Sequence, residues 1–127
     1  MRPRGQQLER GQLSRGAEAV TPDDVRTIAL ALPEVTEGDH HGHPAYRLGT
    51  SVLATQWTTA QLNVLLDESA ARAAEGGPCA LLWWGQRLSG IQVDLTEATP
   101  ELVADLLEEA WARPAPARLR RRHHPEG

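Results

Sequence analysis

The fold of this chain of 127 residues is decided by the stretch from Pro33 to Arg47, which reads PEVTEGDHHGHPAYR. This stretch contains three of the five histidines and the only tyrosine, and it directly follows the first segment with a helical period. Its glycines and prolines predict a polar, turn-rich loop that leads into a strand. The segments on either side of this stretch predict a set of strands with a helix at each end.

One helix is predicted immediately before this stretch, over residues 22–32. Thr21 suits the N-cap, Pro22 suits the first helical position, and apolar residues recur at i, i+3, i+4 and i+7 from Val25. A second helix, over residues 100–112, repeats the Thr-Pro start and has its own apolar stripe. Because each helix has only one stripe to bury, we expect both to pack on the same face of a sheet.

The segments between these helices predict an antiparallel sheet. Predicted strands cover residues 33–37, 45–48, 51–57, 61–66, 81–84 and 89–95. Gly38 is expected to end the first strand, Gly49 to open a two-residue hairpin turn, and Asp67 to cap a short helix over residues 67–75. These elements predict an α+β fold: a two-layer sandwich with the N- and C-terminal helices packed on one face of the sheet.

Composition divides the chain into three regions. Residues 1–20 have no apolar period and predict a disordered extension. Residues 21–113 form the predicted domain, with 5 arginines against 14 acidic residues. Residues 114–127, with 4 arginines and 1 acidic residue, predict a flexible basic tail. The body is therefore acidic, with a net charge of −9, and it is a poor surface for binding phosphates.

Several classes of protein are excluded. No run approaches the roughly 18 apolar residues of a transmembrane helix, so no membrane association is expected. The single cysteine, Cys79, excludes an internal disulfide, favours the cytoplasm, and is expected to be buried and inert. A nucleophile elbow and a phosphate-binding glycine loop are both missing. We expect no enzyme activity, no cofactor, and a monomer or weak dimer.

Three motifs in order resemble the MmcQ/YjbR family: TPDDVR at 21–26, LPEVTEG at 32–38 and GHPAYR at 42–47. Later matches are VLLD at 64–67, WWG at 83–85 and AW at 110–111, so that the resemblance covers about residues 21–119. It implies a small frataxin-like sandwich with a double-wing topology that binds DNA. The chain departs from the family where Ser-Gly-Ile stands at 89–91 in place of Gly-Trp. It also has polar and apolar residues on the sheet where relatives have basic ones.

The implied DNA-binding function depends on arginine contacts to the phosphate backbone. The candidate nucleic-acid contacts are Arg47, Arg118, Arg120, Arg121 and Arg122. Because the body is acidic, binding is expected to be weak, indifferent to sequence, dependent on the C-terminal tail and sensitive to salt.

The alternative function is binding of a protein or small ligand on the sheet face or in a groove near two tryptophans. Trp83 and Trp84 are adjacent in a predicted strand, so they should face opposite ways, with one exposed or in a groove. The residues assigned to this groove are His43, Tyr46, Trp57, Trp83 and Trp84.

The histidine cluster allows two interpretations. His41 and His43 could share a divalent metal, with Glu37 or Asp39 as a third ligand. Alternatively, the segment is a turn in which His43 packs or hydrogen-bonds at the start of a strand. Since no remote Cys/His pair completes a closed site, we favour the turn and expect no metal.

Overall fold

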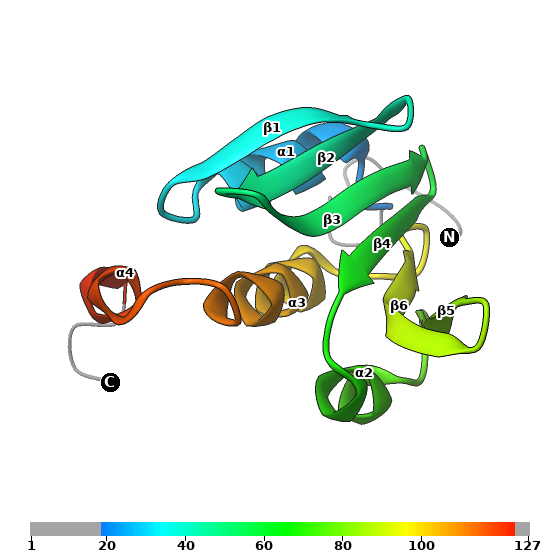
Figure 1. Ribbon diagram of the computed structural model, residues 1–127. Coiled ribbons are helices and arrows are strands. Elements are labelled where there is room, and N and C mark those ends of the chain that lie inside the picture. The colour runs from blue at the N-terminus through cyan, green and yellow to red at the C-terminus, as the bar shows by residue number, and fades with distance from the viewer. Residues whose placement is uncertain (1–18, 124–127) are drawn as a thin grey trace.

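The computed structural model describes residues 19–123 and shows a six-stranded antiparallel sheet with helices packed against it (Figure 1). The elements in chain order are α1 (Pro22–Leu30), β1 (Val35–His40), β2 (His43–Leu48), β3 (Ser51–Thr58), β4 (Gln61–Leu65), α2 (Glu68–Ala74), β5 (Cys79–Trp84), β6 (Arg87–Asp94), α3 (Pro100–Ala112) and α4 (Ala117–His123). The strand order is β1-β2-β3-β4-β6-β5, and all neighbours are antiparallel. The predicted α+β two-layer sandwich is confirmed.

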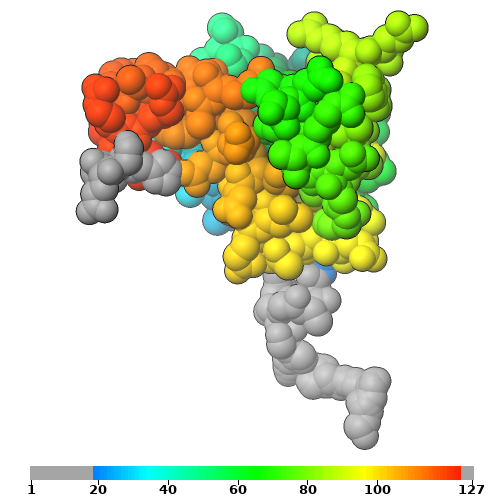
Figure 2. Space-filling model, turned by 90° about the horizontal axis from the view of Figure 1, so that it is seen from below, coloured from blue at the N-terminus to red at the C-terminus, as the bar shows by residue number. Residues whose placement is uncertain are grey.

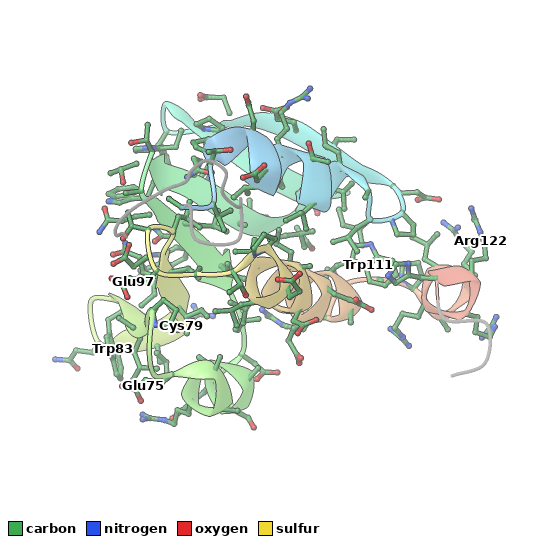
Figure 3. The ribbon with its side chains drawn as sticks, turned by 180° about the vertical axis from the view of Figure 1, so that it is seen from behind. Glu75, Cys79, Trp83, Glu97, Trp111 and Arg122 are labelled. Atoms are coloured by element: carbon green, nitrogen blue, oxygen red, sulfur yellow. The ribbon has the colours of Figure 1, made fainter. Side chains whose placement is uncertain are left out.

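Both terminal helices of the predicted sandwich form as expected, and both cover the same face of the sheet. Thr21 and Asp24 form a capping box at the start of α1, with each side chain accepting the other's backbone N–H at 3.1 and 3.0 Å. Thr99 caps α3 by accepting the N–H of Leu102 at 3.1 Å. Figure 3, seen from behind, shows α1 and α3 side by side in front of the sheet.

The core lies between this helical layer and one face of the strands. The strand residues that point into it, Leu62, Val64, Ile91 and Val93, are fully buried. Trp111 on α3 is 1% exposed, and its indole N–H donates to the carbonyl of Pro33 at 3.0 Å. Trp111, in the segment 100–112 whose apolar stripe was expected to pack on the sheet, therefore lies in the core. The side chain also ties α3 to the stretch that decides the fold.

The stretch from Pro33 to Arg47 contains more β-strand than its glycines predicted. Gly38 does not end β1, because it pairs with Ala45 of β2 inside a continuous hairpin. The turn consists of His41 and Gly42, both with positive φ (54° and 85°), which is characteristic of a tight type I′ turn. Asp39 supports this turn by accepting the N–H of Gly42 at 3.1 Å. The cross-strand pairing overrides the weak strand propensity of one glycine.

The structure has a helix, α4, where the sequence suggested a flexible tail. Leu119 of α4 is buried, and the His123 ring contacts the Trp111 ring with centroids 5.0 Å apart. Arg118 lies 3.3 Å from the carboxylate of Glu34. One buried leucine within a run of arginines is too short a pattern to reveal a helix by periodicity. Residues 1–18 of the predicted extension and residues 124–127 of the predicted tail lie outside the described residues.

The structure also bears on the single cysteine and on the expectation that no helix spans a membrane. Cys79 is buried at the start of β5, as predicted, and burial raises the pKa of its thiol. Between residues 19 and 123, no helix combines the length and the apolar character needed to cross a membrane.

Candidate functional site

A groove of about 460 Å³ lies on the face of the sheet opposite to α1 and α3. Its floor contains Thr55, Asn63 and Gln92, which are cross-strand neighbours on β3, β4 and β6. Their immediate chain neighbours, such as Val64 and Ile91, point into the core beneath the helices. Because successive side chains of a strand point to opposite faces, the three polar side chains must point away from the helical layer.

The walls of the groove are aromatic and stand at the two opposite edges of its floor, on the same face of the sheet. On one side, the rings of His43 and Trp57 are stacked, with centroids 4.3 Å apart and an angle of 24° between their planes. On the other side stand Trp83 and Trp84 of β5. Trp57, Trp83 and Trp84 are 45%, 46% and 53% exposed. The remaining lining residues are His40, His41 and Leu82.

Trp83 and Trp84 do not divide between core and surface as simple alternation predicts. Both are exposed and both line the groove. The pairing of β5 with β6 shifts between Leu82 and Trp83, which disturbs the alternation at this point. The hairpin tip also projects beyond the helices, as Figure 2 shows for the yellow-green atoms, so that no core is present there to bury either ring.

The floor is held by a chain of side-chain hydrogen bonds. Thr58 bonds Gln61 at 3.2 Å, Gln61 bonds Gln92 at 3.0 Å, and Gln92 bonds Asn63 at 2.8 Å. The sequence interpretation missed Thr55, Asn63 and Gln92 as site residues. The signal was present: Asn63 and Gln92 each stand between two apolar residues of a predicted strand.

The groove is electrically neutral apart from its histidines. Among residues 19–123, no arginine and no carboxylate lines it, although the sequence from 21 to 113 has a net charge of −9. A phosphate or carboxylate placed there would find no guanidinium partner along the lining. The arrangement suits the face of a flat, uncharged molecule that stacks on indole rings and makes hydrogen bonds with the floor.

Of the residues assigned to the groove from the sequence, His43, Trp57, Trp83 and Trp84 line it, whereas Tyr46 does not. Tyr46 is 2% exposed and shares the helix-facing side of the sheet with its cross-strand partner Ala54. The assignment of Tyr46 is therefore corrected. Strand β2 alternates, and Tyr46 falls on the opposite face from His43.

The burial of Tyr46 predicts how its phenol titrates and how the stability of the protein changes at alkaline pH. Burial, and secondarily the negative charge of Glu37, raise the pKa of Tyr46 above its ordinary value of 10.0. Since the folded pKa is above the unfolded one, the stability from burying the neutral phenol is full below pH 10. It is lost as pH rises through the folded pKa. Tyr46 is the only tyrosine, so tyrosinate absorbance at 295 nm should titrate with one midpoint above 10. A midpoint at 10 in the folded protein would contradict this burial.

The arginines assigned to nucleic acid do not gather at the groove. Arg47 donates to the carbonyl of Asp39 at 3.2 Å, and Arg120 donates to carbonyls at the end of α3 and just beyond it. Arg121 and Arg122 are exposed on α4, and within the described chain neither makes an ion pair. Figure 3 shows Arg122 and Trp83 at opposite ends of the molecule, so α4 and the groove are separate surfaces.

The residues proposed for a metal site are engaged in other contacts. Glu37 lies 2.6 Å from Arg26 of α1, and Asp39 caps the His41–Gly42 turn. His43 stacks on Trp57, as the packing interpretation expected. Among residues 19–123, no group of three or more His, Cys, Asp or Glu side chains could hold a metal ion.

The chain was compared with protein-family models, curated proteins and solved structures, and no match was found in any of the three.

Proposed function

We propose that this protein is a binding domain whose groove, on the face of the sheet opposite to α1 and α3, takes a small, flat, uncharged ligand. The observation that carries this proposal is the arrangement of three exposed tryptophans, Trp57, Trp83 and Trp84, around a buried polar floor. The groove volume of about 460 Å³ lies in the range of roughly 300–1,000 Å³ that is usual for small-molecule sites.

Exposed aromatic rings in a cluster need a physical reason. Burying a large aromatic side chain is strongly favourable, and an exposed apolar patch often marks a binding surface. The chain buries Trp111 completely and leaves its other three tryptophans at the groove. A flat ligand that covers the open face of Trp57 would remove part of this surface from water.

The expected affinity is modest because the groove is open on one side. A nucleoside has about 17 non-hydrogen atoms, and drug-sized ligands bind with roughly 0.3 kcal/mol per atom. This gives about 5 kcal/mol, which corresponds to a Kd of roughly 0.2 mM. Uridine is a suitable probe because it is flat in its base and uncharged.

Titration of uridine against the tryptophan fluorescence of the full chain tests this function. We expect saturable quenching near the Kd above. In Trp57→Leu the affinity should fall by about five- to 150-fold, because stacking on one ring contributes roughly 1–3 kcal/mol. Dihydrouridine, whose ring is not flat, should bind more weakly. The matched control is the double variant Arg121→Ala/Arg122→Ala on α4, which should bind uridine like the native chain. No saturable response to uridine or other flat neutral probes would contradict the proposal.

A second candidate is weak nucleic-acid binding through α4. It is supported by the exposed guanidinium groups of Arg121 and Arg122, which form no ion pair within residues 19–123, and by the resemblance of residues 21–119 to the MmcQ/YjbR family. Arg118 and Arg120 already contact protein groups, so about two phosphates can be neutralised. The slope of log K against log salt should then be near −1.8 for duplex DNA. Anisotropy titrations at two salt concentrations, with the double α4 variant as the comparison, distinguish this surface from the groove.

We also propose membership of the MmcQ/YjbR family. Its support is the motif order quoted above together with an antiparallel sheet that has both terminal helices on one face, which is the arrangement that the resemblance implies.

A further inference from the structure

The hydrogen-bond chain beneath the groove has a direction. Thr58 Oγ1 accepts the N–H of Ala60 at 3.2 Å, so its own proton is given to Gln61 Oε1. The amide of Gln61 then donates to Gln92, and the amide of Gln92 donates to Asn63. In both Gln61 and Gln92, the side-chain oxygen therefore points toward Thr58 along the series of hydrogen bonds, and the NH₂ group points toward Asn63. Hydrogen bonds aligned in this way strengthen one another.

The series of hydrogen bonds that begins at Thr58 ends at the NH₂ group of Asn63. The side-chain oxygen of Asn63 accepts from Gln92 at 2.8 Å, whereas its NH₂ donates to no group in residues 19–123. The residue is 7% exposed and lines the groove. Between residues 19 and 123, Gln56 Oε1 is the side-chain atom that is fully buried without a hydrogen-bond partner, so the NH₂ of Asn63 is open to solvent in the groove. A ligand that displaces this solvent must supply an acceptor, because a donor left without a partner is costly. A ligand acceptor in the groove would complete the chain.

A second polar group stands beside this donor. Thr55 is the direct cross-strand partner of Asn63, is also 7% exposed, and lines the groove. Its hydroxyl forms no hydrogen bond with another described residue, and it can donate or accept. Directly paired strand residues have their Cβ atoms about 4.5–5.5 Å apart. The floor therefore offers a donor next to a group that can act as an acceptor.

We propose that the groove selects a flat heterocycle with a ring carbonyl beside a ring N–H, which is the lactam or imide edge of uracil- and guanine-type bases. The carbonyl would accept from the NH₂ of Asn63, and the ring N–H would donate to the hydroxyl of Thr55. The ring faces would lie against the tryptophan walls. This inference rests on the proposed function, and it names the class of ligand that the same site takes.

Such an edge could belong to a free nucleoside or to a base in a single-stranded nucleic acid. No arginine of residues 19–123 lines the groove, and the chain has no lysine, which favours the uncharged nucleoside. Uridine and a short oligo-dT are therefore titrated in parallel at two salt concentrations. Equal or weaker binding of the oligonucleotide supports the free nucleoside. Tighter, salt-sensitive binding of the oligonucleotide that still requires Asn63 supports the same edge in a single strand.

The variant Asn63→Asp tests the donor directly, because it keeps an oxygen for Gln92 and replaces only the NH₂ that faces the groove. Tryptophan fluorescence is titrated with uridine and with phenyl C-riboside, which has the same sugar and a flat ring without acceptors. In the native chain, uridine should bind about tenfold or more tightly than phenyl C-riboside. In Asn63→Asp, uridine binding should weaken by roughly ten- to hundredfold, since a donor is replaced by a negative charge, while phenyl C-riboside binding should change little.

The isosteric variant Thr55→Val gives an independent test if Asn63→Asp does not fold. The native chain should bind N3-methyluridine at least several-fold more weakly than uridine, and Thr55→Val should remove this difference. Equal binding of uridine and phenyl C-riboside by the native chain would overturn the inference and leave the proposed function standing. Binding of neither probe would overturn the proposed function itself.

Discussion

Replacing Gly90 by alanine is expected to destabilise the protein by about 3 kcal/mol or more. A Cβ atom at this position would lie 2.0 Å from the carbonyl oxygen of Val64 and 2.9 Å from the Cα of Leu65. Both are backbone atoms of the neighbouring strand, so neither can move without separating β4 from β6 at the floor of the groove. Overpacking of this kind and an unfavourable backbone conformation (φ of 158°) each cost roughly 1–3 kcal/mol.

Urea unfolding of the full chain measures this effect, with Gly49→Ala as the matched control. Gly49 also has a positive φ, 61°, but a Cβ there would meet no atom within 4 Å. The control should therefore lose only the cost of the left-handed backbone, about 1–2 kcal/mol. Equal midpoints for the two variants would contradict the close approach of the two strands at Gly90.

The second large effect is expected from Trp111→Ala, which should destabilise the protein by roughly 3–5 kcal/mol. The indole is buried between α3 and α4, contacts the His123 ring, and donates to the carbonyl of Pro33. Its removal leaves a cavity and an acceptor without its donor. The comparison is Trp84→Ala, whose ring is 53% exposed and should contribute less than about 1 kcal/mol.

Thermal or urea unfolding of these two variants separates the structural tryptophan from a groove tryptophan. A large loss of stability in Trp84→Ala would mean that this ring holds the fold together, and its exposure would then no longer point to ligand binding. A small loss in Trp111→Ala would contradict the packing of α4 against α3.

The helices and the fold class could be predicted from the sequence because their signals are local. The Thr-Pro starts of α1 and α3 and their single apolar stripes specify where each helix begins and which side it buries. The hairpin at Gly49 is equally local, since its turn type requires a glycine at the first position. A turn at His41 and Gly42 was expected, but the pairing of β1 with β2 up to this turn was not, because Gly38 was expected to end the first strand.

The groove could be predicted only in part. Its tryptophans are easily identified in the sequence. Their position around one floor, however, depends on the strand order, which places β6 between β4 and β5. Asn63 and Gln92 become neighbours only through this non-sequential pairing. Tyr46 was misassigned because one residue of register decides which face of a strand a side chain occupies. Helix α4 depends on burial of Leu119 against a tertiary surface that no local pattern encodes.

The most direct test of the groove is a uridine titration followed by the indole N–H signals in the NMR spectrum of the full chain. The protein has four tryptophans, and Trp111 serves as an internal control because it is buried away from the groove. We predict saturable shifts for Trp57 and for at least one of Trp83 and Trp84, with one common Kd near 0.2 mM, while the Trp111 signal stays in place. No shift of the three groove indoles at millimolar uridine, or a shift of Trp111 alone, would contradict binding in the groove.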